Sequence, residues 1–223
     1  PFYPLLVRGI SFLFSIAPDN AAQAVSILST FCGLFVFYRL AKLENISRPL
    51  LPILFLLVYP VSFFFSAVYT TGLYFFLASA ALLAMREKRW LLSGLFGALA
   101  SATQVFGVFL LLAAVLEYMK EKEKKIMHVA YLVLIPIGLL SFMAYLWTSV
   151  GDPLAFFHTQ PLFGAQRSGS AIILLPQVLW RYLHIASTLA IDSYVYWIAL
   201  FELATLCFAL YLFWFGLTRN MSK

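Results

Sequence analysis

Residues 126–147 read IMHVAYLVLIPIGLLSFMAYLW, an apolar run without one lysine, arginine, aspartate or glutamate. A helix needs roughly 20 apolar residues to cross the hydrocarbon core of a bilayer, and this run is that long. Runs 20–40 and 193–217 are long enough as well. The sequence therefore predicts at least three helices that cross a membrane.

The composition of the whole chain agrees with this interpretation. Of its 223 residues, 63% are hydrophobic and only 11% are charged, which is far more apolar than a soluble domain. The net charge of +6 does not indicate a nucleic-acid partner, because the basic residues border apolar runs. Cys32 and Cys207 lie inside apolar runs, so we expect buried thiols and no disulfide.

Most basic residues fall into four short clusters between the apolar runs. The clusters are Arg39, Lys42 and Arg48; Arg86, Lys88 and Arg89; Lys120, Lys122, Lys124 and Lys125; and Arg219 and Lys223. They hold all but three of the 15 lysine and arginine residues. Since positive residues favour cytoplasmic loops, we expect all four clusters on the cytoplasmic side.

This sidedness requires an even number of crossings between consecutive clusters. Runs 50–67 and 69–85 supply one pair of crossings. Run 90–118 must then be a hairpin of two short pieces that turns near Thr103–Gly107. A single tilted helix over 90–118 is the alternative, and it would place the following basic cluster outside. We favour the hairpin.

The remaining topology leaves 148–192 as an outer loop, with helices 126–147 and 193–217 on either side of it. Within that loop, Gln177, Arg181, His184 and Thr188 recur at helical spacing in run 171–190, which predicts a helix lying in the outer interface.

Run 5–17 contains Arg8, is too short to cross, and also predicts an outer interfacial helix. We expect Asp19 or Asn20 to cap the first crossing helix. The sequence thus predicts an all-α, polytopic, integral membrane protein, with a single transmembrane domain over 1–223.

Several chemistries are excluded by the motifs. The chain has no glycine-rich phosphate loop, no Asp-x-Asp pair, no Gly-x-Ser-x-Gly elbow and no metal-ligand spacing, so we expect no metal and no cofactor. The polar residues that are candidates for a site lie instead in three stretches that our topology brings to the outer face. These are Tyr59–Thr70, Ala100–Gly107 and Gly151–Gln160. Polar turns that converge there predict a site at the membrane–water boundary.

The same stretches carry a resemblance to a known family. Its motifs are FYPLL at 2–6, FFSAVYT at 64–70, WLLSG at 90–94, ASAT at 100–103 and GDPLAF at 151–156. Together they resemble the PIG-V type (GPI mannosyltransferase 2-like) of membrane mannosyltransferase, within the GT-C glycosyltransferase superfamily. The resemblance implies a GT-C-like helix bundle. It also implies transfer of mannose from a polyprenyl-phosphate donor to a lipid-anchored or exported acceptor.

The resemblance also implies a main catalytic aspartate in a first outer loop. Because the chain begins Pro1-Phe2-Tyr3-Pro4 without methionine, we expect it to be a fragment that lacks this loop and the first span, and to be inactive alone. Similar proteins carry an acid where this chain has Thr71 and an arginine where it has Gln104. These two changes have two interpretations. Either this chain is active and has replaced both partners of a salt bridge together, which we favour, or its activity is altered or lost.

The candidate catalytic side chains are Asp152 and His158. Asp152 precedes a proline, so it either caps a turn or accepts a proton from the acceptor hydroxyl. His158 is either solvated or donates a proton near a phosphate.

Six further residues are candidates for substrate binding. Arg167 and Arg181 are suited to a lipid phosphate, although Arg181 also fits snorkelling from its helix. Tyr69, Thr70 and Gln104 belong to the outer turns, where an interfacial aromatic belt also explains the tyrosine. Glu202 lies inside the last span and faces a polar groove or pairs with Arg8.

Two other functions stay open. A transporter or flippase is indicated by the interrupted hairpin near Thr103–Gly107, because broken helices also line transport sites. A non-catalytic relative of the transferases is indicated by Thr71 and Gln104. For the transferase, the expected partners are a polyprenyl-phosphate sugar donor, a lipid or exported acceptor, and membrane lipids.

Overall fold

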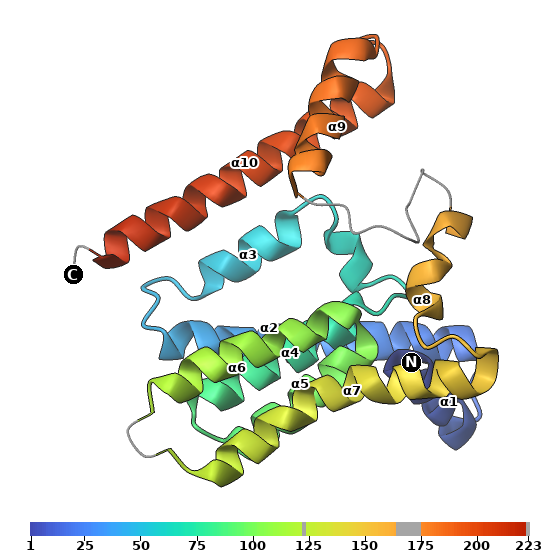
Figure 1. The fold of residues 1–223 in the computed structure, drawn as a ribbon, viewed down its shortest axis with the longest axis vertical. Helices are drawn as coiled ribbons and strands as arrows, with labels where there is room; N and C mark the ends of the chain where they lie inside the picture. The colour runs from blue at the N-terminus through green and yellow to red at the C-terminus, as the bar shows by residue number, and fades with distance from the viewer. Residues whose placement is uncertain (122–123, 164–174, 222–223) are drawn as a thin grey trace. The chain divides into compact units, whose positions relative to one another are not determined.

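The computed structural model describes residues 1–121, 124–163 and 175–221, which form helices joined by turns and contain no strand. The predicted all-α class is confirmed for this part of the chain. The chain divides into two compact units, Pro1–Ala155 and Phe156–Lys223 (Figure 1). Our expectation of one domain over 1–223 stays a prediction, and the expected outer loop 148–192 extends across the boundary between the units.

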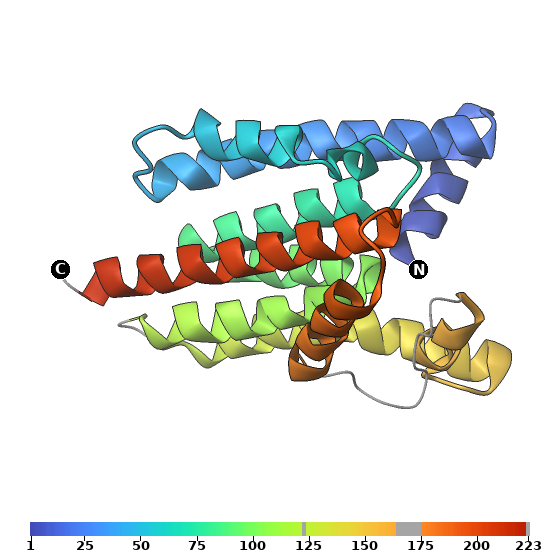
Figure 2. The same ribbon diagram turned by 90° about the horizontal axis from the view of Figure 1, so that it is seen from above.

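The first unit is a bundle of helices joined by turns. Its helices are α1 (Phe2–Phe14), α2 (Pro18–Leu43), α3 (Leu50–Val58), α4 (Thr71–Arg86), α5 (Trp90–Thr103), α6 (Leu110–Met119) and α7 (Ile126–Val150), with 3-10 helices η1 (Ser62–Phe65) and η2 (Val105–Phe109). Two views show α2, α4, α5, α6 and α7 running along one common direction (Figures 1 and 2).

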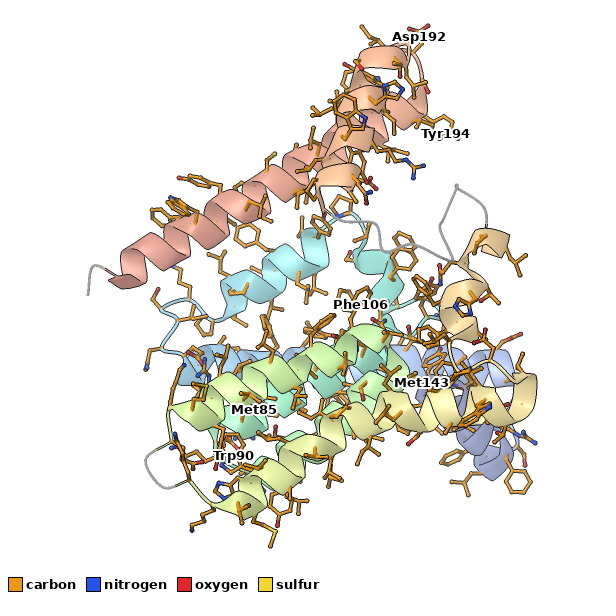
Figure 3. All side chains as sticks on the ribbon, in the orientation of Figure 1. Met85, Trp90, Phe106, Met143, Asp192 and Tyr194 are labelled. Carbon is orange, nitrogen blue, oxygen red and sulfur yellow. The ribbon has the colours of Figure 1, made fainter. Side chains whose placement is uncertain are left out.

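The second unit consists mainly of a helical hairpin. Its helices are α9 (Leu175–Thr188) and α10 (Tyr194–Met221), preceded by η3 (Gln160–Phe163) and by most of the short helix α8 (Ala155–His158). Asp192 and Tyr194 mark the turn that joins α9 to α10 (Figure 3).

Three helices of the described chain are long and apolar enough to cross a membrane. They are α2, α7 and residues Tyr194–Leu212 of α10, and they match the three long runs of the sequence. The other apolar helices, including α4 and α5, are shorter.

The predicted continuous helix over 50–67 is wrong. Helix α3 has only 9 residues, and Tyr59 leaves the helical region with φ −61° and ψ 135°. Pro60 explains the break, because its ring disfavours helical backbone in the preceding residue and it has no N–H to donate. At 1.5 Å per residue, α3 is about 14 Å long, less than half of a hydrocarbon core.

Two smaller expectations are also wrong. Neither Asp19 nor Asn20 caps α2, because the helix begins at Pro18 with Ala17 as N-cap and no side-chain cap. Proline suits the first helical position, where its fixed φ is already helical. The thiols of Cys32 and Cys207 are exposed rather than buried, because the described helices of their own units do not cover them.

The predicted hairpin within 90–118 is confirmed. Helix α5 ends at Thr103, and Gln104 is extended, with φ −139° and ψ 141°. Helix α6 then returns, so that the indole Nε1 of Trp90 donates to Glu121 Oε1 at 3.4 Å. A single tilted helix is incompatible with this contact between the two ends of the segment.

The core of the first unit joins side chains from α1, α2, α4, α5, α6 and α7. Its largest members include Tyr3, Leu73, Leu77, Met85, Trp90, Leu132 and Ile135. Met85 and Trp90 lie towards one end of the bundle, and Phe106 and Met143 towards the other (Figure 3).

Glycine residues set the closest helix contact in the unit, between α5 and α7. A Cβ on Gly138 would lie 1.9 Å from the carbonyl oxygen of Ala98, and one on Gly94 would lie 2.2 Å from that of Tyr131. Small residues at such positions let two helix backbones approach closely. The hydroxyl of Ser101 uses this proximity to donate to the Ile135 carbonyl at 2.5 Å.

We therefore expect Gly138→Ala to destabilise the protein by roughly 1–3 kcal/mol, because the added methyl meets backbone that cannot move independently. The measurement is the melting temperature of the protein purified in detergent. Gly9→Ala is the matched control, since a Cβ there meets nothing within 4 Å. That variant should melt at or slightly above the wild-type temperature. Equal melting temperatures for the two variants would contradict this account of the α5–α7 contact.

Candidate functional site

Ion pairs gather at one end of the first unit, which we call the charged end. It is formed by Arg39, Glu44, Arg86, Glu87, Lys88, Glu117, Lys120 and Glu121, from the C-terminal ends of α2, α4 and α6 and the turns that follow them. Arg86 is central, because its guanidinium lies 2.6 Å from Glu44 and 2.5 Å from Glu117. Residues from three of the four basic clusters thus lie together at one end, as the sequence predicts.

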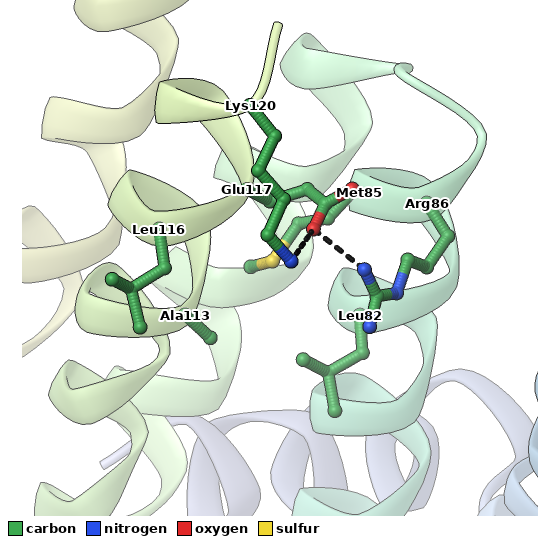
Figure 4. Close-up of a pocket in the computed structure, with 7 residues that line it drawn as sticks. All are labelled: Leu82, Met85, Arg86, Ala113, Leu116, Glu117 and Lys120. Atoms are coloured by element: carbon green, nitrogen blue, oxygen red, sulfur yellow. Dashed lines mark hydrogen bonds and ion pairs between the residues drawn. The ribbon is translucent and has the colours of Figure 1, made fainter. Parts of the chain in front are cut away.

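A small pocket of about 210 Å³ lies at this charged end (Figure 4). The carboxylate of Glu117 lies between Arg86 and Lys120, 2.5 Å and 3.4 Å from their nitrogens. Each charge in the pocket already has an opposite charge beside it. Exposed pairs of this kind contribute little stability. Because these charges already pair with one another, we interpret the pocket as paired charges at helix ends rather than as a ligand site.

The opposite end of the unit, the polar end, is formed by Tyr3, Ser26, Thr30, Thr70 and Gln104. Helix α4 has 16 residues, so at 1.5 Å per residue the two ends lie about 24 Å apart. Thr30 Oγ1 donates to the Phe65 carbonyl at 2.7 Å, and Ser26 Oγ donates to the Tyr69 carbonyl at 3.1 Å. The hydroxyl of Tyr3 contacts Ser26 Oγ at 3.0 Å.

A side-chain hydrogen bond joins two of the three predicted outer stretches. The amide nitrogen of Gln104, after α5, donates to Thr70 Oγ1, before α4, at 3.0 Å. Both side chains are partly buried. The predicted convergence of Tyr59–Thr70 with Ala100–Gly107 is therefore confirmed.

The third stretch, Gly151–Gln160, follows helix α7, which begins near the charged end. Gly151 terminates the helix with φ 78°, a left-handed conformation that glycine adopts without strain. Asp152 Oδ1 then accepts the backbone N–H of Leu154 at 2.9 Å, so the turn-capping role considered for Asp152 is present. His158 ends α8 in the second unit, where its ring lies at 61° to that of Phe157, with the ring centroids 6.0 Å apart. Arg167 lies outside the described residues.

In the second unit, Glu202 of α10 accepts a hydrogen bond from the Tyr182 hydroxyl of α9. This is the observed partner of Glu202 within the second unit; the polar groove or the pair with Arg8 considered for it stays a prediction. The hydrogen bond raises the pKa of the Tyr182 phenol above its ordinary value; burial and the negative charge of Glu202 add to the effect, and Arg181 opposes it. Arg181 is exposed on the same helix.

Sequence reasoning missed two residues of the polar end, Ser26 and Thr30, and the neighbouring Gln23 on the same helix. All three reach backbone carbonyls of the segment 65–69, with Gln23 donating to Ser66 at 3.3 Å. A signal was available, because these polar residues recur at spacings of three and four on one face of the apolar run 20–40. Polar groups inside such a run need partners from neighbouring elements.

An aromatic groove of about 460 Å³ opens beside the polar end. Its walls come from α2, α3, η1 and the first residue of α4, and include Phe37, Phe55, Tyr59, Phe64, Phe65 and Thr71. The groove is mainly apolar, and its polar lining residues are Tyr59, Ser62 and Thr71. Its dimensions and lining suit a hydrocarbon chain.

Protein-family models, curated proteins and solved structures were compared with the chain, and none of them matches it. The resemblance to the PIG-V type therefore rests on the sequence motifs alone. Within the described residues, no group of three or more His, Cys, Asp and Glu side chains is placed to hold a metal ion.

We expect Thr30→Val to destabilise the protein by roughly 1–3 kcal/mol, because it leaves the Phe65 carbonyl without its hydroxyl donor. Hydrogen exchange of the amides in 62–70 should accelerate with the fall in melting temperature. Thr148→Val is the control, because that hydroxyl bonds only within its own helix, to the Tyr145 carbonyl. If both variants exchange 62–70 at the wild-type rate, Thr30 does not hold this turn.

A second prediction concerns the pH dependence of the second unit. Because the pKa of Tyr182 is raised in the folded state, its phenol keeps a proton that the unfolded chain loses. This contribution to stability is complete below about pH 10, the ordinary tyrosine value, and is lost as pH rises further. Glu202→Gln should return the pKa towards the ordinary value, measured by NMR of ¹³Cζ-labelled tyrosine. An unchanged Tyr182 titration in that variant would contradict the assignment to Glu202.

Proposed function

We propose that this protein is a multi-pass membrane glycosyltransferase of GT-C type that transfers mannose from a polyprenyl-phosphate donor to a lipid-anchored or exported acceptor. The proposal combines the sequence resemblance with one observation, the hydrogen bond between Gln104 and Thr70. That contact joins the FFSAVYT stretch to the end of the ASAT stretch, at the end of the bundle opposite three basic clusters. A site for a lipid-linked sugar at the outer membrane boundary needs such a meeting of polar turns.

The hydroxyls of Tyr69 and Thr70 are the donors that this site offers. Thr70 Oγ1 accepts from Gln104, and neither hydroxyl donates to a described residue. Tyr69 is 53% exposed, and its ring contacts Phe64, which lines the aromatic groove. The groove would take the prenyl chain, while the two hydroxyls would bind the phosphate or the sugar.

In the proposed reaction, the acceptor oxygen attacks the anomeric carbon and the bond from that carbon to the phosphate oxygen breaks. The acceptor proton passes to a carboxylate, and cationic side chains stabilise the departing lipid phosphate. The resemblance assigns the main catalytic aspartate to the expected first outer loop, and Asp152 of the GDPLAF segment after α7 is the candidate carboxylate within this chain. For the phosphate, the candidates stay those that the sequence offers, namely Arg167, Arg181 and His158.

The experiment is transfer of labelled mannose from a polyprenyl-phosphate donor by membranes that contain the full-length protein, with the expected first outer loop. We expect Gln104→Leu and Thr70→Val to lower the transfer rate about 100-fold, the usual cost of losing a donor at a developing charge. Asp152→Asn should lower it at least as much. Thr148→Val and Asp192→Asn are matched controls and should keep the wild-type rate. Absence of transfer by the wild type, where a PIG-V-type enzyme is active, would contradict the proposal.

Transport of a lipid is the second candidate function. It is favoured by the interruption between α5 and α6, where Gln104 is extended and η2 follows. Interrupted helices line the substrate sites of many transporters. Here, however, the break is closely packed, since a Cβ on Gly107 would lie 2.4 Å from the Ser101 nitrogen. Movement of a fluorescent lipid across proteoliposomes without sugar transfer would favour the transporter, and neither activity would favour the non-catalytic relative.

A further inference from the structure

Arg8 stands apart from the other basic residues of the first unit. The described lysines and arginines of that unit otherwise lie near the charged end, in or beside the turns after α2, α4 and α6. Arg8 lies instead on α1, whose Tyr3 packs against α2 at the polar end. Its guanidinium makes no ion pair with a described carboxylate of the first unit.

The surroundings of Arg8 on α1 are apolar and exposed. Leu5 is 66% exposed and Phe12 is 87% exposed. At 3.6 residues per turn, both lie within about 60° of Arg8 around the helix, whereas the buried Tyr3 lies about 140° away. A helix with one packed face and one exposed apolar face that carries a cation is suited to the membrane interface.

A pocket of about 350 Å³ lies at the corner between α1 and α2. It is lined by Tyr3, Pro4, Val7, Arg8, Ser11 and Pro18. The hydroxyls that line it are already used, because Tyr3 donates to the Ala22 carbonyl and Ser11 donates to the Ile16 carbonyl. Arg8 is therefore the charged donor of an otherwise apolar pocket.

The walls of this pocket are fixed by the turn that joins the two helices. Ser15 ends α1 in the left-handed region, with φ 52°, and the Ile16 N–H returns to the Ser11 carbonyl. Pro18 then begins α2 with its restricted φ. The pocket is thus formed before any ligand enters it.

We propose that this pocket binds one bilayer phospholipid, with the lipid phosphate on Arg8 and the start of an acyl chain along Pro4 and Val7. A guanidinium binds phosphate through paired hydrogen bonds and keeps its charge beside hydrocarbon. An apolar wall next to a single cation matches an amphiphile better than free phosphate. The bound lipid anchors α1 in the interface, and this inference does not depend on sugar transfer.

The experiment is native mass spectrometry of the delipidated full chain titrated with dioleoyl phosphatidylglycerol. The wild type should retain one lipid tightly, and Arg8→Gln should weaken that binding roughly tenfold or more, the usual effect of losing a charged hydrogen bond. Arg8→Lys should be intermediate. Arg48→Gln removes the same charge in the turn before α3 and should leave this binding unchanged.

Two further arms identify the ligand. Dioleoylglycerol, which lacks the phosphate, should bind at least tenfold more weakly, and millimolar inorganic phosphate should not displace the phospholipid. Pro4→Trp keeps Arg8 but fills the pocket and should also lose the lipid, which tests the site if Arg8→Gln does not fold. The proposal is overturned if Arg8→Gln and Pro4→Trp both bind phosphatidylglycerol like the wild type, if inorganic phosphate competes, or if a polyprenyl phosphate displaces the phospholipid at equal concentration.

Discussion

A backbone carbonyl that is removed from water and outside a regular helix needs a hydrogen-bond donor from elsewhere in the protein, so an irregular segment between packed helices depends on the side chains around it. Pro60 ends α3 early and creates such a segment, from Tyr59 to Thr70. Thr30 and Ser26 supply the hydroxyls that reach its carbonyls at Phe65 and Tyr69. The position of Thr70, and hence its contact with Gln104, depends on these two hydrogen bonds from α2.

The two ends of the first unit have different physical tasks. The charged end collects arginine, lysine and glutamate side chains that need water or one another, and pairs most of them across three turns. The polar end carries hydroxyls, an amide and aromatic rings, which tolerate the boundary between hydrocarbon and water. This separation keeps the described lysines and arginines of the first unit away from Thr70 and Tyr69, with Arg8 on α1 as the exception.

Close packing in the bundle comes from small side chains rather than from large apolar ones. Many large side chains, such as Phe31 and Leu140, are exposed on the described helices, while Gly94 and Gly138 lie at the α5–α7 contact. In lipid, apolar side chains gain nothing from leaving their surroundings, so helices associate where backbones can approach closely. The α5–α7 contact also determines where Gln104 lies, because it fixes the position of the C-terminal end of α5 along α7.

The sequence alone determined the helical class, the three long apolar helices, the interruption near Gln104 and the gathering of basic clusters at one end. These features follow from composition, run length and charge position, which are local properties of the chain. The length of α3, the start of α2 and the exposure of both thiols differ from the predictions. The two helix bounds each depend on one proline, and the exposure of the thiols depends on which helix face a neighbour covers. Only the tertiary structure joined Gln104 to Thr70, gave Glu202 its partner Tyr182, and showed Arg8 alone in an apolar pocket. Each of these depends on how separate helices pack, and hydropathy contains no information about which side chains face each other.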